Sequence, residues 1–293
     1  MTPLRLGVLA WPVEPTAGLA AFAAKLDHWL AQAAGRADLV LLPEYACVEL
    51  GPALAGGGAP DAAAELRAVL EAAPAILGAM RAAARRHGLW LLPGSLPMRQ
   101  GAAAVNRVPL IAPDGRLAFQ DKRMLTRFEV ERWGLSPGAG PQVFATPWGR
   151  MGVSICYDAE FPKHVRAQVE AGAWLVLVPA CTDTRHGSNR VRFACQARAM
   201  ENQCFVALAP TVGAAPGCAS LDTNHGQALV CGPVDRGFPE DGMLASGALD
   251  APGWVFVSLD PARIEAVRRD GAVLNHRDWP RAPLPAPGLA VFA

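Results

Sequence analysis

One cysteine follows an apolar run at a position where chemistry can reach it. Residues 151–155 read as a buried strand, Cys156 comes next, and Tyr157, Asp158 and Pro162 follow. A thiol at such a position lies at the rim of a sheet rather than in its interior. A cysteine is a strong nucleophile only as its thiolate, which needs a nearby base or positive charge. Without such partners a cysteine in an apolar strand is inert packing.

Two other polar residues hold comparable positions at strand ends. Glu44 follows the apolar run 39–42, and Lys122 follows the strand-like segment 116–120. A glutamate whose pKa is raised by burial can accept the thiol proton, and a lysine can favour the thiolate and stabilise an oxyanion. The N–H of Tyr157 could complete the oxyanion hole. No histidine stands at a comparable strand end, which argues against a Cys/His mechanism.

The three residues are far apart in sequence, so the fold must bring them together. Lys122 is 78 positions after Glu44 and 34 before Cys156 (122 − 44 and 156 − 122). Each motif taken alone is a weak signal, because an isolated glutamate or lysine after a strand is usually a solvated loop residue. The combination, in this order and with these surroundings, predicts a thiol enzyme.

The elements that must position these residues alternate along the chain. Strands are expected at residues 4–9, 39–42, 89–92, 105–111, 116–120, 151–155, 174–178, 205–209 and 254–259. Helices are expected at residues 19–33, at 61–87 with a break near Pro74 and a stop at Gly88, at 161–171, and from a cap at Ser188 or Asn189 to 203. Residues 113–115 predict a hairpin turn. This order indicates an α/β layered fold with a mixed sheet, in which functional groups gather at strand ends.

Composition narrows the classes of function. Of the 293 residues 52% are hydrophobic and 18% charged, which allows a substantial core and mildly favours oligomers, and the formal net charge is +1. No long basic run indicates nucleic acid or a membrane surface. The N-terminus lacks the features of a signal peptide, and no apolar run approaches the roughly 18 residues of a membrane span. The seven scattered cysteines predict reduced thiols in a cytoplasmic protein, without C-x-x-C spacing for zinc.

The chain resembles the nitrilase (carbon–nitrogen hydrolase) superfamily, whose Glu–Lys–Cys triad attacks nitriles and amides. The matching motifs run in family order at residues 41–45 (glutamate), 121–125 (lysine), 155–162 (cysteine), 178–182 (downstream strand) and 196–203 (downstream helix). Met124 departs from the pattern, because many members have histidine there.

This resemblance implies a fold, an assembly and a cofactor requirement. It implies one domain over residues 1–293, built as an α-β-β-α sandwich with mixed sheets. Homodimers or higher homo-oligomers are expected, with residues 261–293 as a tail that contacts the partner. Neither a metal nor an organic cofactor is expected.

The resemblance also suggests supporting residues. Glu129, seven positions after Lys122, would position the lysine or the substrate amide, although residues 126–133 alone would be interpreted as a charged surface loop. Glu160 would either contact the substrate or cap the helix that begins near residue 161. Cys181 would line the pocket wall.

The residues after the nucleophile favour one branch and one reaction. Nitrile hydrolysers usually have Trp-Glu there, whereas this chain has Tyr157-Asp158, and residues 126–133, 181–185 and 273–279 resemble the Rim-like branch. The predicted function is an EC 3.5 amidase or omega-amidase-like enzyme. It would cleave a non-peptide C–N bond of a small amide through a thioester and release ammonia or an amine. The alternatives are a nitrilase, an acyl transferase with an amine acceptor, and a non-catalytic binding protein.

Overall fold

The computed structural model describes residues 2–281, and strand β1 (Leu4–Pro12) runs through the middle of its sheet. β1 pairs in parallel with β2 (Leu39–Leu41) and antiparallel with β14 (Gly253–Leu259). The last residues of β1 pair in parallel with the end of β10 (Phe205–Ala214). β1 therefore connects two halves of a mixed sheet.

The first half extends from β2 through four further strands, of which the last two form a hairpin. Its further strands are β3 (Trp90–Leu92), β4 (Leu96–Gln100), β5 (Ala103–Ile111) and β6 (Leu117–Asp121). β3 is parallel to β2, whereas β5 is antiparallel to β3, β4 and β6. The predicted hairpin at residues 113–115 is confirmed: Gly115 has a φ of 85° and its N–H donates to the Ala112 carbonyl at 2.8 Å.

The second half extends from β10 in the other direction. Its further strands are β7 (Val143–Thr146), β8 (Gly149–Val153), β9 (Leu175–Ala180), β11 (Thr223–Asn224), β12 (Leu229–Cys231) and β13 (Met243–Ser246). β10, β9 and β8 are parallel neighbours, and β7 closes this edge antiparallel to β8. The parallel ends of β8 and β9 thus point the same way, which matters for the site at their carboxyl ends.

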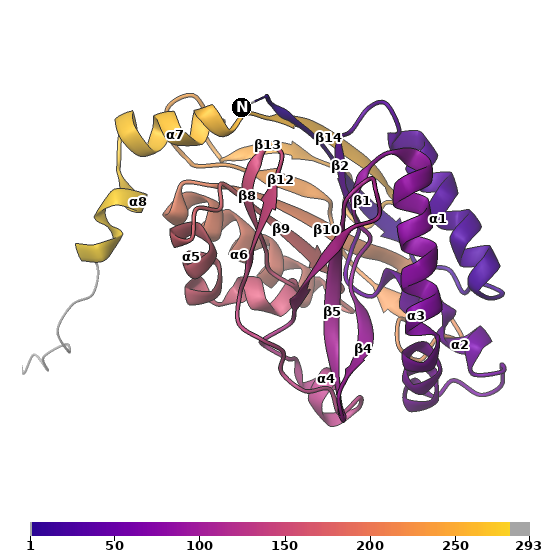
Figure 1. Cartoon of the computed structure of the whole chain (residues 1–293). Helices are drawn as coiled ribbons and strands as arrows, with labels where there is room; N and C mark the ends of the chain where they lie inside the picture. Colours follow the sequence, from indigo (N-terminus) through magenta and orange to yellow (C-terminus); the bar gives the residue numbers. More distant parts are fainter. Residues whose placement is uncertain (1, 282–293) are drawn as a thin grey trace, which may run out of the picture.

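Helices cover the two outer faces. Their bounds are α1 (Leu19–Ala33), α2 (Gly51–Leu54), α3 (Ala62–His87), α4 (Arg127–Glu131), α5 (Pro162–Glu170), α6 (Arg185–Asn202), α7 (Pro261–Asp270) and α8 (Asn275–Asp278). Figure 1 shows α1 and α3 on one side, α5 and α6 on the other, and the strands between them. The predicted α-β-β-α sandwich with mixed sheets is confirmed.

Alternating side chains of the strands divide the core into two apolar clusters. Leu6 and Val8 of β1 pack between the two halves of the sheet with residues of the second half. Leu9 and Trp11 of the same strand face the other way and pack with Phe22 and other residues of α1 and α3. Because successive side chains of a strand point to opposite faces, one apolar strand can serve both clusters. Within the described residues no helix has the length and apolar character that a membrane crossing requires.

The expected break in the second helix is wrong. α3 continues from Ala62 to His87 with Pro74 inside it and ends, as predicted, at Gly88, whose φ is 64°. Proline removes a backbone donor and disfavours the helix interior. Here the flanking residues Ala73 and Ile76 are buried in the cluster below α3, so packing holds both halves in line.

The expected start of the α6 helix is also wrong. α6 begins at Arg185, and its N-cap is Thr184, whose Oγ1 accepts from the Gly187 N–H at 3.1 Å, instead of Ser188 or Asn189. Thr184 provides the same type of cap one turn earlier. Of the expected C-terminal tail 261–293, the part up to 281 contains α7 and α8, and 282–293 lie outside the described residues.

Candidate active site

Three strand ends bring Glu44, Lys122 and Cys156 together in the interior. Glu44 and Lys122 are each 1% exposed and Cys156 is 4% exposed. The Lys122 Nζ lies 2.8 Å from Glu44 Oε1. The main chain of Cys181, at the end of β9, bridges the other two: its N–H donates to Glu44 Oε2 at 3.1 Å, and its carbonyl accepts from Cys156 Sγ at 3.6 Å. The structure therefore unites the three residues that the sequence analysis singled out.

Lys122 lies between two buried carboxylates. Besides Glu44, its Nζ contacts Glu129 Oε1 at 2.9 Å and Oε2 at 2.8 Å. The Asn106 amide donates to Glu44 at 2.8 Å and to Glu129 at 3.2 Å, and the Tyr45 hydroxyl donates to Glu129 at 2.6 Å. Sequence reasoning missed Asn106 and Tyr45. The signal that could have identified Asn106 as a site residue is its position as a polar residue inside the apolar strand β5.

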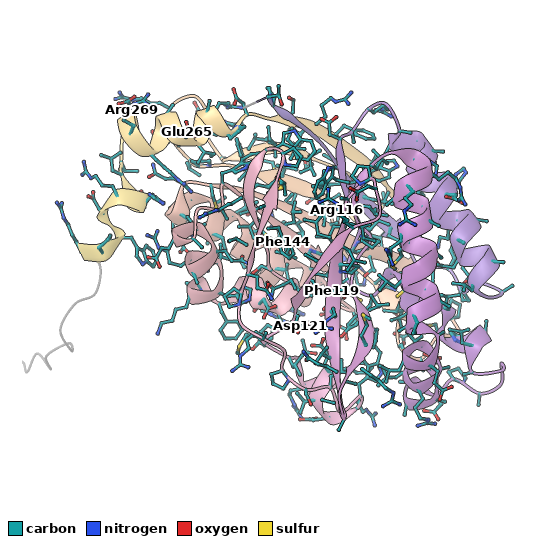
Figure 2. All side chains as sticks on the ribbon, in the orientation of Figure 1. Arg116, Phe119, Asp121, Phe144, Glu265 and Arg269 are labelled. Atoms are coloured by element: carbon teal, nitrogen blue, oxygen red, sulfur yellow. The ribbon has the colours of Figure 1, made fainter. Side chains whose placement is uncertain are left out.

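The end of β6 fixes the position of the lysine. Figure 2 shows Phe119 and Asp121 along β6, which ends one residue before Lys122. Asp121 forms two hydrogen bonds with the Arg107 guanidinium, at 2.5 and 2.9 Å. The Gly138 N–H donates to the Lys122 carbonyl at 2.9 Å, and a Cβ at Gly138 would lie only 2.1 Å from the Asp121 Cβ. The close approach of this second segment therefore requires glycine at position 138.

Glu129 is buried because α4 folds back over the lysine. The segment 126–133, which taken alone resembled a charged surface loop, is a short helix with a capping box. The Thr126 side chain accepts from the Glu129 N–H, and Glu129 Oε2 accepts from the Thr126 N–H at 2.8 Å. Glu129 thus holds its own helix start and Lys122 at once. Only the resemblance, and not the charge pattern, pointed to this residue.

The charges of this cluster oppose the effect of burial. Burial raises the pKa of Glu44 above its ordinary value, although Lys122 and hydrogen bonding with the Cys156 thiol act against the shift. Burial also favours a neutral Lys122, but the nearby Glu129 and Glu44 raise the pKa of Lys122 well above its ordinary value. Burial likewise acts against an ionised Glu129, yet Lys122 holds the pKa of Glu129 below its ordinary value. The lysine and Glu129 are therefore a charged pair, and Glu44 is the more basic carboxylate.

The Cys156 thiol is neutral at rest. Burial and the neighbouring Glu44 raise the pKa of Cys156 well above its ordinary value, and Lys122 only partly offsets them. A base must therefore remove the proton as the sulfur attacks. Cys156 also has a φ of 47°, in the left-handed region, which costs a non-glycine residue about 1 kcal/mol. This conformation turns the chain sharply from β8 into the 3-10 turn Cys156–Glu160.

Asp158 connects the cysteine turn to the lysine segment. It is fully buried, and its Oδ1 accepts from the N–H of Met124 at 2.7 Å and of Arg123 at 3.2 Å. Burial raises the pKa of Asp158 to about 7, against the effect of these hydrogen bonds. In the sequence Asp158 only indicates a branch of the family, and the structure adds this bridging contact.

Asp158→Asn is expected to change how stability depends on pH. Between about pH 4 and pH 7 folded Asp158 keeps a proton that the unfolded chain has released, so the free energy of unfolding falls as pH rises through this window. The variant lacks this titration, so its stability relative to wild type should rise by on the order of 3 kcal/mol between pH 4 and pH 8. Urea unfolding at several pH values measures the difference. If the difference in stability between Asp158→Asn and wild type stayed the same from about pH 4 to pH 8, the raised pKa of Asp158 would be contradicted.

Asp114→Asn is the matched control. Asp114 lies exposed in the hairpin turn, where the Arg116 N–H and side chain hold the pKa of Asp114 below its ordinary value. The difference in stability between Asp114→Asn and wild type should therefore stay constant between about pH 4 and pH 8.

The remaining expected residues, Tyr157, Glu160 and Cys181, line the same cavity as Cys156. Tyr157 packs edge-on against Phe161, with ring centroids 4.9 Å apart. The Glu160 carboxylate lies 3.5 Å from the Arg190 guanidinium. The helix-cap alternative for Glu160 is wrong: Phe161 is the N-cap of α5, without a side-chain hydrogen bond, and Glu160 belongs to the preceding turn. Cys181 lines the cavity beside Cys156, and its Sγ lies 3.7 Å from Asn224 Oδ1.

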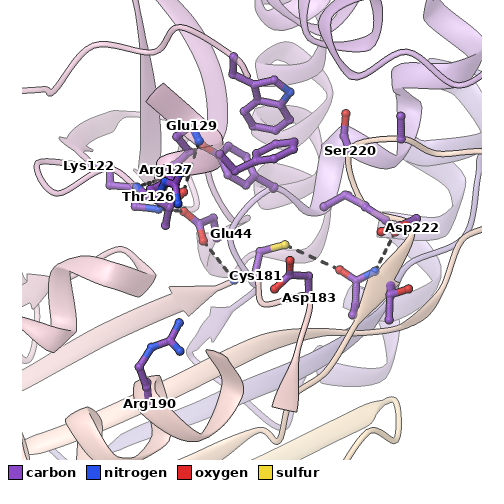
Figure 3. A pocket seen from close by; sticks show the side chains of 17 residues that line it. Glu44, Lys122, Thr126, Arg127, Glu129, Cys181, Asp183, Arg190, Ser220 and Asp222 are labelled. Carbon is purple, nitrogen blue, oxygen red and sulfur yellow. Dashed lines mark hydrogen bonds and ion pairs between the residues drawn. The ribbon is translucent and has the colours of Figure 1, made fainter. Parts of the chain in front are cut away.

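Two adjoining cavities open onto these residues. One of about 310 Å³ is lined by Glu44, Lys122 and Glu129, and one of about 450 Å³ is lined by Cys156. Both share five lining residues: Thr126, Arg127, Cys181, Asp183 and Arg190. Figure 3 shows Glu44 and Cys181 at the centre of the first cavity, with Arg190 at its edge. Cavities of this size suit a small organic ligand.

The first cavity is lined by aromatic side chains as well as polar ones. Tyr45 packs edge-on against Trp133 at 5.0 Å, and Phe128 packs against Trp133 at 5.1 Å. Ser220 and Asp222 also line this cavity, on the side away from Lys122 (Figure 3). Among residues 2–281 no group of three or more histidine, cysteine or acidic side chains is arranged to hold a metal ion.

Known proteins share this sequence and fold. The family model described as carbon–nitrogen hydrolase matches residues 9–241. Probable hydrolase YhcX of Bacillus subtilis is 27% identical over 277 residues, which cover 94% of this chain but only 53% of YhcX. A deaminated glutathione amidase of Synechocystis is 30% identical over 226 residues, which cover 71% of this chain and 79% of that protein. This chain thus spans about half the length of YhcX.

A solved structure of an amidase is also similar. It is a Glu-to-Gln mutant of the amidase from Nesterenkonia sp. AN1, which shows the result of Michael addition of acrylamide at the active-site cysteine. The two chains are 25% identical with a TM-score of 0.70, over 94% of this chain and 99% of the other.

Proposed function

This chain belongs to the carbon–nitrogen hydrolase family, and from that premise we propose that it is a thiol-dependent amidase acting on small amides. The observation that carries the proposal is the buried Glu44–Lys122–Glu129 array, whose cavity adjoins the cavity lined by Cys156. A buried ion cluster is a poor way to gain stability, because removing charges from water is costly. A cavity that opens onto such a cluster is better explained by chemistry.

In the first half-reaction Cys156 becomes acylated. Glu44 accepts the thiol proton as the sulfur attacks the amide carbonyl carbon, and the carbonyl π electrons move to oxygen. The ammonium of Lys122 and the N–H of Tyr157 hold the resulting oxyanion. When the carbonyl re-forms, the C–N bond breaks, and Glu44 gives its proton to the departing nitrogen. Ammonia or an amine leaves, and a thioester remains on Cys156.

In the second half-reaction water replaces the sulfur. Glu44 accepts a proton from water as the oxygen attacks the thioester carbonyl. Collapse of this second oxyanion breaks the C–S bond, the thiolate regains the proton from Glu44, and the carboxylic acid leaves. In this scheme Glu129 keeps Lys122 charged and in place and does not itself transfer a proton.

Similar proteins support an amide over a nitrile as the substrate. The Synechocystis relative is described as an amidase of deaminated glutathione, and the Nesterenkonia protein is an amidase whose cysteine forms a covalent adduct with acrylamide. Tyr157-Asp158 after the nucleophile favours the same choice.

A matched substrate panel tests the proposed reaction. Purified protein is incubated with primary amides and with the nitriles of the same carbon skeletons, and released ammonia and carboxylic acid are both quantified. We expect equimolar ammonia and acid from amides, with nitriles at least about 100-fold slower. Faster turnover of nitriles would identify a nitrilase. Added hydroxylamine would reveal acyl transfer if hydroxamate replaced the acid, and inertness towards the whole panel would favour a binding protein.

A further inference from the structure

A short loop forms the wall of the first cavity opposite Glu44. Residues 215–222 connect β10 to β11, and their carboxyl-terminal part lines this cavity. The Ala215 N–H donates to the Asp222 carbonyl at 2.8 Å, which closes the base of the loop. Figure 3 shows Ser220 and Asp222 on the far side of the cavity from Lys122.

One carboxylate on a distant helix holds the tip of this loop. Glu65, in the first turn of α3, is 2% exposed. Its Oε1 accepts from the Ala219 N–H at 2.9 Å, and its Oε2 accepts from the Ser220 N–H at 3.0 Å and the Ser220 hydroxyl at 2.5 Å. The Cys218 thiol donates to Oε2 at 3.8 Å. Three consecutive loop residues thus converge on one side chain.

The surroundings of Glu65 are closely packed and, among the described residues, contain no basic partner. Within residues 2–281, no lysine, arginine or histidine lies within salt-bridge distance of Glu65, so the loop donors are what satisfy its carboxylate oxygens. The backbone of α2 lies so close that a Cβ at Gly51 would be 2.8 Å from the Glu65 Cβ. Because a buried carboxylate is strongly destabilised without its donors, Glu65 ties the loop to the helix layer.

We propose that Glu65 is a positioning residue that sets the acyl-chain specificity of the enzyme by holding residues 219–222 as the far wall of the cavity. The proposal rests on the proposed amidase function. With ammonia as the leaving group, every substrate atom beyond the carbonyl carbon belongs to the acyl chain. The distance from the reacting carbon to the 219–222 wall therefore limits the length of the chain that fits.

Glu65→Gln tests this proposal. Glutamine has one acceptor oxygen, and its amide group would face the loop donors with an N–H, so the wall should become mobile. For straight-chain primary amides of increasing length, we expect the KM of the best wild-type substrate to rise about tenfold while kcat stays within about twofold. Discrimination against the next longer amides should fall about tenfold. An equal loss of kcat/KM on every amide, or a chain-length profile that matches that of wild type, would overturn the proposal.

Two further variants keep the test decisive. Glu71→Gln, exposed on the same helix, should have the wild-type profile. Ser220→Ala removes one donor from the loop itself, and it should shift the profile in the same direction by a smaller factor. If Glu65→Gln fails to fold, the profile of Ser220→Ala decides, and an unchanged profile there counts against the proposal.

Thiol alkylation separates this proposal from the proposed function. Cys156 displaces bromide from 2-bromoacetamide or 2-bromohexanamide and forms a C–S bond without hydrolysis of the amide. The ratio of the two labelling rates, followed by mass spectrometry, should change about tenfold in Glu65→Gln. If wild type hydrolyses no amide, the proposed function fails, but the labelling ratio still tests Glu65. A ratio equal to that of wild type would refute the positioning role.

Discussion

Amide hydrolysis is expected to fall by at least about 10⁴-fold when Cys156 is replaced by alanine, because the acyl intermediate forms on its sulfur. The loss should appear in kcat, since the cavity walls remain. Alanine keeps the fold and removes only the thiol, so unfolding by urea should be close to that of wild type. Steady-state ammonia release measures the effect, and intact-protein mass spectrometry of the quenched reaction should show an acyl adduct on wild type only.

The neighbouring cysteine provides an internal comparison. Only the main chain of Cys181 touches Glu44 and Cys156, and its own thiol points to Asn224. A Cys181→Ala variant should therefore still form the adduct on Cys156. An adduct on Cys181, or activity of Cys156→Ala within about 100-fold of wild type, would be incompatible with the assignment of Cys156 as nucleophile.

Lys122→Met is expected to damage both activity and stability. The substitution keeps the length of the side chain but removes the positive charge between Glu44 and Glu129. Loss of the oxyanion contact should lower kcat about 10²- to 10³-fold. Two buried carboxylates without their partner should lower the free energy of unfolding by about 3–5 kcal/mol at pH 8. Urea unfolding and amide turnover, measured on the same preparation, test both effects.

The pH dependence of this stability loss gives the prediction a second test. Lys122 lowers the pKa of both Glu44 and Glu129, so without it both carboxyls should hold protons to higher pH. The folded variant then keeps protons that the unfolded chain releases, and its stability deficit should grow as pH rises from 5 to 8. Lys163→Met, at an exposed position of α5, should change stability by less than about 0.5 kcal/mol at either pH. If Lys122→Met and Lys163→Met lowered the free energy of unfolding equally, Lys122 would have no special role in stability.

Local patterns were sufficient for most elements of the fold. The apolar runs before Glu44 and Lys122 and the segment before Cys156 predicted strands, and β2, β6 and β8 confirm them. The turn glycine at 115 and the stop at Gly88 were also predicted correctly, because glycine has a specific conformational role there. The errors came where packing overrides local preference, as at Pro74 inside α3.

The supporting network was harder to predict because its members interact only through space. Asn106 and Tyr45 come from different elements, yet both reach Glu129. Glu65 lies more than 150 positions before Ser220, which it holds. A local sequence pattern reflects only residues that are neighbours along the chain. The hydrogen-bond partners of Asn106, Tyr45 and Glu65 lie far away in the sequence.

The sequence by itself determined the residue types for the chemistry and the strand ends on which they lie. An apolar run that stops at a cysteine, a glutamate or a lysine indicates a polar group at the rim of a sheet, because side-chain burial follows the strand period. Only the tertiary structure decided that one lysine would lie between two carboxylates and that Cys181 would bridge Glu44 and Cys156. Those contacts depend on strand register and on the close approach of separate segments, and both are set by the packing of the whole chain.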